Sequence, residues 1–317
     1  MTGPVLISPV NISEGRRQEV IDRVAAEAET RDVHVLDVHT DPDHNRSVLT
    51  IAGPAERLLV ALLNVTGMAI EHIDISRHKG VHPRLGAVDV VPFVALREQD
   101  RPVAIDTARR YAEEVFALLG VPGFLYGWGS GGRHTPVVGG QALAEGEQTA
   151  GGERSLPEVR RQAFKSLPPD VPAGDDGGPH PSAGAIAVGA RDLLVAYNVD
   201  LTTDDPSVAR AIANDVRRIE GIRALGLMLP SRGQTQVSMN LIQPLVTGLG
   251  DAFDAVAALA DRAEVEIAGS ELVGLAPRGA IPADKDRLRL RRPAKVLEDE
   301  IARHFGDLVT AGGGKGP

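Results

Sequence analysis

Histidines and basic residues gather most densely between Ser76 and Arg84, in the segment SRHKGVHPR. Two histidines and three cations share these nine positions: Arg77, His78, Lys79, His82 and Arg84. A histidine can exchange a proton near neutral pH, and guanidinium and ammonium groups bind carboxylates. Gly80 and Pro83 predict a shaped loop rather than a helix. The segment therefore predicts a site for proton transfer on an anionic substrate, although a run of charges is equally typical of a solvated loop.

The same histidines leave a metal site open as an alternative. His78 and His82 have the i, i+4 spacing of a helical ligand pair. Further ligands could come from Asp37, His39, Asp41 and His44. However, Gly80 and Pro83 disfavour a helix here, and no glutamate follows His78 as in the H-E-x-x-H arrangement. We therefore expect no metal, with a metal-dependent hydrolase as the alternative.

Two further segments could bind a ligand. Asn11 to Gly15 (NISEG) is typical of a helix N-terminus, whose free N–H groups can bind an anion. A second stretch, rich in Gly and Pro, leads directly into an expected strand and predicts a rigid loop against a planar ligand, with an inter-domain linker as the alternative. It consists of Gly177, Gly178, Pro179, His180, Pro181, Ser182, Ala183 and Gly184.

Hydrophobic periodicity predicts the elements that must position these segments. The first half is expected to run strand, helix, strand, strand, helix, strand over 5–8, 16–29, 33–38, 47–52, 54–73 and 88–96. The second half repeats this order over 193–200, 206–219, 224–229, 236–241, 251–263 and from 265. Both follow the βαββαβ order of ferredoxin-like units. We therefore predict an α/β (α+β) fold of two ferredoxin-like subdomains.

The material between the halves is less regular. A helix over 104–119, a strand over 121–126 and a helix over 156–167 are expected, with a Gly-rich surface loop over 127–153. We place the subdomains at 1–183 and 184–317, with a disordered tail from about residue 311.

Composition limits the function classes. The chain of 317 residues has no cysteine, which excludes disulfides and thiol nucleophiles. A net charge of −9 and 3% aromatic residues argue against general nucleic-acid binding. No apolar run is long enough to span a membrane, and the start of the chain does not resemble a signal peptide. We therefore expect a cytoplasmic protein that binds small molecules, with neither nucleic acid nor membrane as a partner.

Seven ordered blocks resemble the glutamate formimidoyltransferase (formiminotransferase) family. They are PVNISEGRRQEVID, LDVHTDPDHNRSVLTIAGP, DISRHKGVHPRLGAVDVVPFV, VPGFLYG, VGARDLLVAYNVDL, QVSMNL and GSELVGLAP, spread over residues 9–277. The resemblance implies transfer of the formimidoyl group between N-formimidoyl-L-glutamate and N5 of tetrahydrofolate, the co-substrate, in histidine degradation. It also implies two α/β subdomains with a ligand tunnel between them, a homodimer, and no cyclodeaminase domain.

The resemblance also assigns roles to residues. The family's catalytic histidine matches His82, and its folate-binding stretch maps onto Gly177 to Gly184, where His180 departs from the animal pattern. His39 is another departure, since the animal relatives carry an acid there, so His39 or Asp41 would replace it. Residues expected to bind the donor substrate are Asn11, Asp37, Asp41, Arg77, His78, Lys79 and Arg84.

The chemistry of this transfer predicts which groups help. Attack on the cationic amidine gives a tetrahedral centre rather than an oxyanion, so a base and an acid matter more than an oxyanion hole. His82 can take the N5 proton and pass it to the departing amine. A carboxylate should balance the amidinium, and Asp37, Asp41 and Glu14 are the candidates. A formyltransferase on the same scaffold, or a folate-binding protein without turnover, are the alternative functions.

Overall fold

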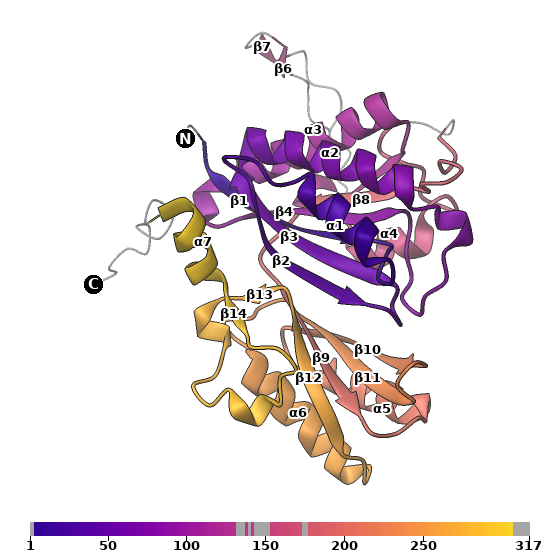
Figure 1. Ribbon diagram of the computed structural model, residues 1–317, viewed down its shortest axis with the longest axis vertical. Helices are drawn as coiled ribbons and strands as arrows, with labels where there is room; N and C mark the ends of the chain where they lie inside the picture. The colour runs from indigo at the N-terminus through magenta and orange to yellow at the C-terminus, as the bar shows by residue number, and fades with distance from the viewer. Residues whose placement is uncertain (1–2, 131–136, 139–140, 143–152, 173–176, 307–317) are drawn as a thin grey trace.

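The computed structural model describes residues 3–130, 137–138, 141–142, 153–172 and 177–306. Within these ranges the chain forms two main β-sheets, each covered by helices on its outer face (Figure 1). Most of the predicted 127–153 loop and the tail from about residue 311 lie outside the described residues. Of that loop, only the two short strands β6 (Val137–Val138) and β7 (Gln141–Ala142) are described after residue 130 and before residue 153, and they pair with each other.

The first sheet begins with the predicted βαββαβ unit. Its elements are β1 (Val5–Ile12), α1 (Gln18–Ala26), β2 (His34–Asp41), β3 (Arg46–Pro54), α2 (Ala55–His72) and β4 (Val88–Ala95). The strands lie in the order β2-β3-β1-β4, and each neighbouring pair is antiparallel. Because β3 lies between β1 and β2, this is the split βαβ arrangement of ferredoxin-like units, and the predicted fold is confirmed.

An extension adds two parallel strands beyond β4. It contains α3 (Arg101–Leu119), β5 (Gly123–Gly127), α4 (Leu156–Gln162) and β8 (Ile186–Ala190). β8 pairs in parallel with both β4 and β5. All five residues of β8 are buried, as expected for a parallel strand covered on both faces. β8 follows the predicted boundary at 183/184 yet belongs to the first sheet, so the chain changes sheets between Ala190 and Val195.

The second sheet repeats the topology of the first unit. Its elements are β9 (Val195–Leu201), α5 (Pro206–Val216), β10 (Ile222–Leu229), β11 (Gln234–Leu241), α6 (Leu249–Arg262) and β12 (Ile267–Val273). The strand order β10-β11-β9-β12 corresponds position by position to β2-β3-β1-β4. Separate hydrophobic cores lie under the two sets of helices, one including Leu58 and Phe93 and the other Tyr197 and Val256.

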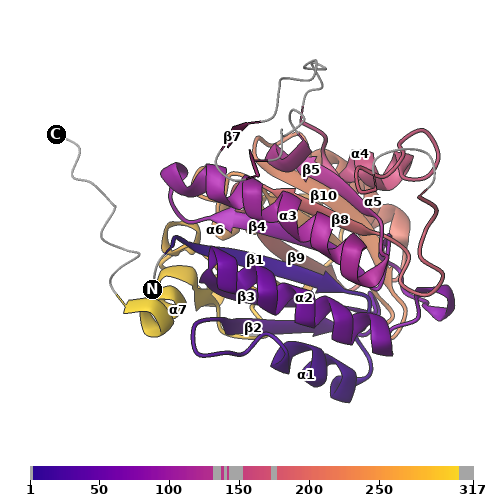
Figure 2. The same ribbon diagram turned by 90° about the horizontal axis from the view of Figure 1, so that it is seen from above.

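The end of the described chain returns to the first sheet. β13 (Leu275–Ala276) and β14 (Lys295–Val296) pair in parallel, and α7 (Leu297–Phe305) follows (Figures 1 and 2). Ile301 and Phe305 of α7 share a buried cluster with Ile7 of β1 and Leu36 of β2. The second half therefore packs against the first through an apolar contact that local sequence patterns do not predict.

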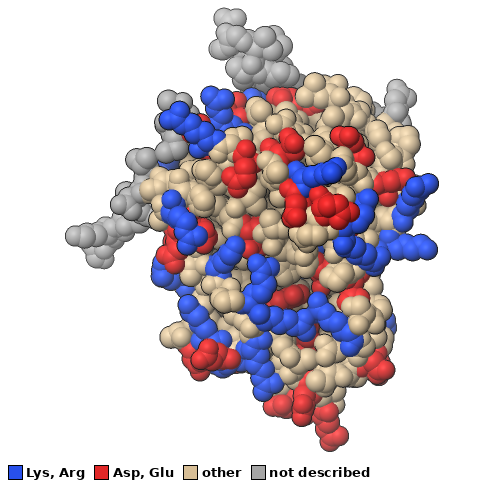
Figure 3. Space-filling view, in the orientation of Figure 1, with Lys and Arg blue, Asp and Glu red and all other residues tan. Residues whose placement is uncertain are grey.

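Part of the space where the two sheets face each other is lined by polar side chains. On β2, Asp37, His39 and Asp41 recur every second residue and share one face of the sheet. Across the junction, Asp43 accepts hydrogen bonds from the backbone N–H and hydroxyl of Ser231, at 2.9 and 2.6 Å. Basic side chains gather where the halves meet on the face shown in Figure 3. Within the described residues, no helix combines the length and hydrophobicity needed to cross a bilayer.

Candidate active site

His82 lies on the loop that joins α2 to β4, and this loop is held by its own side chains. The Arg84 guanidinium donates to the His82 carbonyl through Nε and Nη2, at 3.1 and 2.5 Å. Asp89 of β4 accepts from the Leu85 backbone N–H at 2.6 Å. The loop continues without helix from His78 to β4. Its shape therefore depends on a buried carboxylate inside the following strand.

The hydrogen bonds of His82 define which nitrogen can act as a base. Its Nδ1 lies 2.7 Å from the Pro83 carbonyl, which can only accept, so we assign the ring proton to Nδ1. The lone pair is then on Nε2, and Nη1 of Arg46 lies against the ring, 2.7 Å from Nδ1 and 2.9 Å from Nε2. Burial lowers the pKa of His82, and the nearby charges of Arg46 and Arg160 lower it further. His82 is therefore a neutral imidazole at physiological pH, in the protonation state that accepts a proton.

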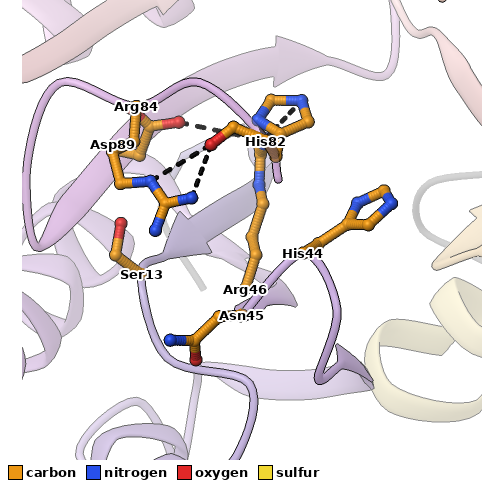
Figure 4. Close-up of a pocket in the computed structure, with 7 residues that line it drawn as sticks. All are labelled: Ser13, His44, Asn45, Arg46, His82, Arg84 and Asp89. Carbon is orange, nitrogen blue, oxygen red and sulfur yellow. Dashed lines mark hydrogen bonds and ion pairs between the residues drawn. The ribbon is translucent and has the colours of Figure 1, made fainter. Parts of the chain in front are cut away.

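Arg46 connects His82 to the end of β1. Its Nε and Nη2 donate to the side-chain oxygen of Asn11, at 2.9 and 2.5 Å. Nη2 also lies 3.8 Å from Asp89, which in turn pairs with Arg160 of α4. Figure 4 shows the small pocket that these groups surround. It is lined by Ser13, His44, Asn45, Arg46, His82, Arg84 and Asp89.

The pocket carries excess positive charge. Three guanidiniums, from Arg46, Arg84 and Arg160, surround the carboxylate of Asp89, which is 1% exposed. Burial lowers the pKa of Arg46 to about 10 and also lowers that of Arg84, so crowding and desolvation both oppose these cations. An anionic ligand would relieve that cost. The charges around Asp89 therefore favour an anionic group, such as a carboxylate, beside the imidazole ring.

The stretch from Gly177 to Gly184 lies against the His82 loop. His180 and Gly184 exchange backbone hydrogen bonds of 2.8 Å, and Nδ1 of His180 accepts from the Ala183 N–H at 3.0 Å. The Ala183 carbonyl then accepts from Ala87 N–H at 2.9 Å. A Cβ on Gly184, whose φ is +71°, would lie 2.3 Å from the Leu85 carbonyl oxygen. This glycine therefore permits the close approach that brings the two predicted segments together.

The three carboxylates proposed from the sequence are already paired. Asp37 contacts Lys295 at 2.7 Å and Arg292 at 3.5 Å. Asp41 contacts Arg232 of the second half at 3.4 Å. Glu14 accepts from the Arg16 and Arg17 N–H groups and pairs with the Arg17 side chain at 2.5 Å. Burial acts to raise the pKa of Glu14, but the contacts with Arg17 and Arg16 outweigh it and hold that pKa below its usual value.

The remaining predicted residues separate into two groups. His78 lies inside the loop, with Nε2 at 2.8 Å from the Asn45 carbonyl and 2.7 Å from Nη1 of Arg84. Arg77 and Lys79 are exposed, and the Arg77 side chain reaches only Asp74, at 3.7 Å. Because this segment is not helical, the His78 and His82 spacing does not place both on one helix face. In the described part of the chain, no three His, Asp or Glu side chains are arranged to hold a metal ion.

Comparison with known families agrees with the fold of two units. The model of the formiminotransferase domain, N-terminal subdomain, matches residues 5–138. The model of the formiminotransferase domain matches residues 196–300. The chain belongs to the formiminotransferase family. Both matched segments contain a complete ferredoxin-like unit of the fold described above.

Curated members of the formiminotransferase family resemble most of the chain. It is 36% identical over 282 residues to the glutamate formimidoyltransferase of Streptococcus pyogenes, covering 86% of this chain and 88% of the relative. A glutamate formimidoyltransferase of Thermoplasma acidophilum is 34% identical over 284 residues, with the same coverage. The formimidoyltransferase-cyclodeaminase of Sus scrofa is 35% identical over 288 residues, and the match spans 50% of that longer protein.

Several residues at this formiminotransferase site were not predicted as members of it. Arg46 follows a turn, Arg160 lies on a short helix and Asp89 lies in the apolar strand β4. The sequence contains one indication for Asp89, because an acid inside an apolar strand will be buried and needs a partner. It contains no such indication for Arg46 or Arg160, because their role depends on tertiary contacts that bring β3, α4 and β4 together.

Proposed function

We propose that this protein is a glutamate formimidoyltransferase that acts in histidine degradation. The formimidoyl carbon leaves the nitrogen of N-formimidoyl-L-glutamate and bonds to N5 of tetrahydrofolate, and the N5 proton ends on the glutamate nitrogen. Support comes from family membership over both subdomains and from relatives of that name that match nearly full length.

The observation that carries the mechanism is the state of His82. Burial and the charges of Arg46 and Arg160 lower its pKa and favour the neutral imidazole, Nδ1 lies 2.7 Å from the Pro83 carbonyl, and Arg46 contacts both ring nitrogens. We propose that His82 accepts the N5 proton and returns it to the departing amine. Proton transfer of this kind contributes about 10²–10⁴-fold to a rate.

Nη1 of Arg46 lies within hydrogen-bond distance of both ring nitrogens of His82, at 2.7 and 2.9 Å. A substrate carboxylate is a stronger acceptor for a guanidinium than an imidazole is, because charge-assisted hydrogen bonds are the stronger ones. We propose that anion binding draws Arg46 away, which frees Nε2 and removes one cause of its low basicity. Arg84 and Arg160 would hold the other carboxylates of the donor or of the folate tail.

We propose that the stretch from Gly177 to Gly184 contacts the planar part of tetrahydrofolate, since it lies directly beside the His82 loop. The polar space between the two sheets would form the ligand tunnel. We further propose a homodimer in the cytoplasm, with small folate and glutamate derivatives as partners. The net charge of −9 disfavours nucleic acid as a partner.

A turnover assay tests this function directly. Purified protein is incubated with tetrahydrofolate and N-formimidoyl-L-glutamate, and acid converts the product to methenyltetrahydrofolate, which is read by absorbance. A parallel reaction uses N-formyl-L-glutamate. We expect product from the formimidoyl donor only. Product from the formyl donor alone would favour the formyltransferase, and folate binding without either product would favour a protein that has lost turnover.

A further inference from the structure

One buried carboxylate differs from the others in the described part of the chain. Nearly all of them lie within ion-pair distance of a lysine or arginine, as Asp37, Asp89 and Asp200 do. The two exceptions in that part of the chain are Asp43 and Glu271. Both oxygens of Asp43 accept hydrogen bonds from Ser231. Glu271 therefore holds a negative charge that the described residues do not neutralise with a lysine or arginine.

The two oxygens of Glu271 have different surroundings. Oε1 accepts from the side-chain amides of Asn198 and Gln236, at 2.9 and 3.2 Å. Oε2 lies 3.7 Å from Nε2 of His39, which is too long for a hydrogen bond. Burial acts to raise the pKa of Glu271, but His39, Asn198 and more distant guanidiniums outweigh it and lower that pKa. The group is thus ionised, fixed through one oxygen and available through the other.

The neighbour of this oxygen, His39, has an unsatisfied polar atom of its own. His39, 7% exposed, has a buried Nδ1 without a hydrogen-bond partner in the described residues. Gln236 is fully buried, and its amide N–H groups donate to Asp200 and Glu271, which orients its Oε1 elsewhere. That Oε1 is directed at the ring of His44, whose pKa a hydrogen bond with Gln236 acts to raise. Buried polar groups without partners are costly, so this cluster is arranged for a polar ligand.

The cluster faces the pocket from the opposite sheet. Glu271 lies on β12, beside Asn198 of the central strand β9. His44 links the two regions, because its ring stacks against that of His82 with centroids 5.8 Å apart and its titration responds to the charge of Glu271. A ligand held between the sheets thus meets cations and a neutral base on one side and an acidic side chain on the other.

We propose that Glu271 binds the cationic amidine of the donor substrate and thereby selects formimidoyl over formyl groups. This inference rests on the proposed function. An amidinium carries a positive charge and N–H donors, which match the free Oε2 of Glu271. A formyl amide is neutral, and it would leave the charge of Glu271 unbalanced. Glu271 supplies the carboxylate that the sequence reasoning sought at Asp37, Asp41 or Glu14.

The test is the Glu271→Gln variant, which keeps the shape of the side chain and an oxygen for Asn198 and Gln236. Loss of a hydrogen bond to a charged group should raise KM or lower kcat/KM for N-formimidoyl-L-glutamate by about 10- to 100-fold. Inhibition by the neutral analogue N-formyl-L-glutamate should change by less than about threefold. The matched control is Glu300→Gln, which removes another buried carboxylate, on α7, where it bonds Arg303.

The outcomes separate this inference from the proposed function. If wild-type protein does not transfer the formimidoyl group, the proposed function fails before Glu271 is tested. If the wild type turns over and Glu271→Gln keeps the same kcat/KM, Glu271 does not bind the amidine. If the variant loses affinity for the cationic donor and the neutral analogue equally, its role is structural and the inference is overturned. A circular-dichroism melt of each variant identifies any that fail to fold, and for those the Glu271→Asp protein replaces Glu271→Gln in the same comparison.

Discussion

The two ferredoxin-like units share one topology but differ in what they present to the space between them. The first presents a crowded set of guanidiniums around Asp89 and a neutral His82. The second presents a carboxylate, Glu271, held by two amides. The same strand order thus supports different chemistry in the two units, because strand order sets where side chains point and the residue types at those positions set the chemistry.

Replacing His82 by alanine should cause the largest loss of activity, and it tests whether the catalytic base lies on the first unit. It removes the only base proposed on the first unit, so kcat should fall by about 10²–10⁴-fold. Folate binding should stay largely intact, because the cations and the stretch from Gly177 to Gly184 are unchanged. Steady-state kinetics together with a fluorescence titration of folate would measure both. Turnover close to that of the wild type would move proton transfer to another group and end the division of roles between the units.

Much of the fold could be predicted from the sequence because it depends on local patterns. Alternating and 3.6-residue periodicities mark both βαββαβ units, and the structure confirms them. The assignment of β8 to the first sheet and the docking of α7 could not be predicted. Both depend on which surface a buried apolar segment meets, and an apolar run contains no information about its partner.

The candidate site also contains residues that could be predicted from the sequence and residues that could not. The His82 loop and the stretch from Gly177 to Gly184 could be located from residue types and from the family resemblance, and the structure places them in contact. Arg46 and Glu271 could not be located, because their importance arises from partners gained or missing after folding. A free buried carboxylate is visible only when all the ion pairs around it are known.

Two buried aspartates, one in each unit, allow the contribution of buried ion pairs to the free energy of unfolding to be compared. Asp89 and Asp200 are 1% and 0% exposed, and each contacts two arginines. Asp89→Asn leaves buried guanidiniums without their shared carboxylate and should cost about 3–5 kcal/mol of unfolding free energy. Burial raises the pKa of Asp200, so its charge is opposed in the folded state, and Asp200→Asn should cost less unfolding free energy than Asp89→Asn.

Urea denaturation followed by circular dichroism would measure both aspartate variants. The m-value should stay constant if each protein unfolds in a similar way. Equal losses of unfolding free energy in the two variants would show that the cations crowded around Asp89 do not increase the cost of removing its charge. A larger loss for Asp200→Asn would reverse the comparison.

The pH dependence of stability should also reflect the first unit. Burial lowers the pKa of both His44 and His82 below their ordinary value of 6.5. In the unfolded chain these groups bind protons below about pH 6.5, so stability should fall as the pH decreases through that value. Each group contributes at most about 1.4 kcal/mol per pH unit. The lowered pKa of Glu271 adds its own loss only at more acidic pH, as its carboxylate takes up a proton.

Thermal melts of the wild type and of His82→Ala between pH 7.5 and 5 would measure this effect. The variant should lose less stability over that range, because it lacks one of the two histidines whose protonation is disfavoured in the folded state. Parallel curves for the two proteins would mean that His82 is protonated in the folded state at these pH values. That result would contradict its assignment as a neutral base.

The smallest effect is expected from the exposed cations of the first unit. Lys79 is exposed, and within the described residues its ammonium has no ion pair. At 0.15 M salt, exposed charges are screened beyond about 8 Å. Lys79→Ala should therefore change KM for either substrate by less than about twofold and leave kcat unchanged. Initial rates at low and physiological salt would measure this, with Arg84→Ala as the half-buried counterpart. A tenfold rise in KM at physiological salt would mean that the loop closes over the substrate, so that the cationic side of the first unit includes Lys79.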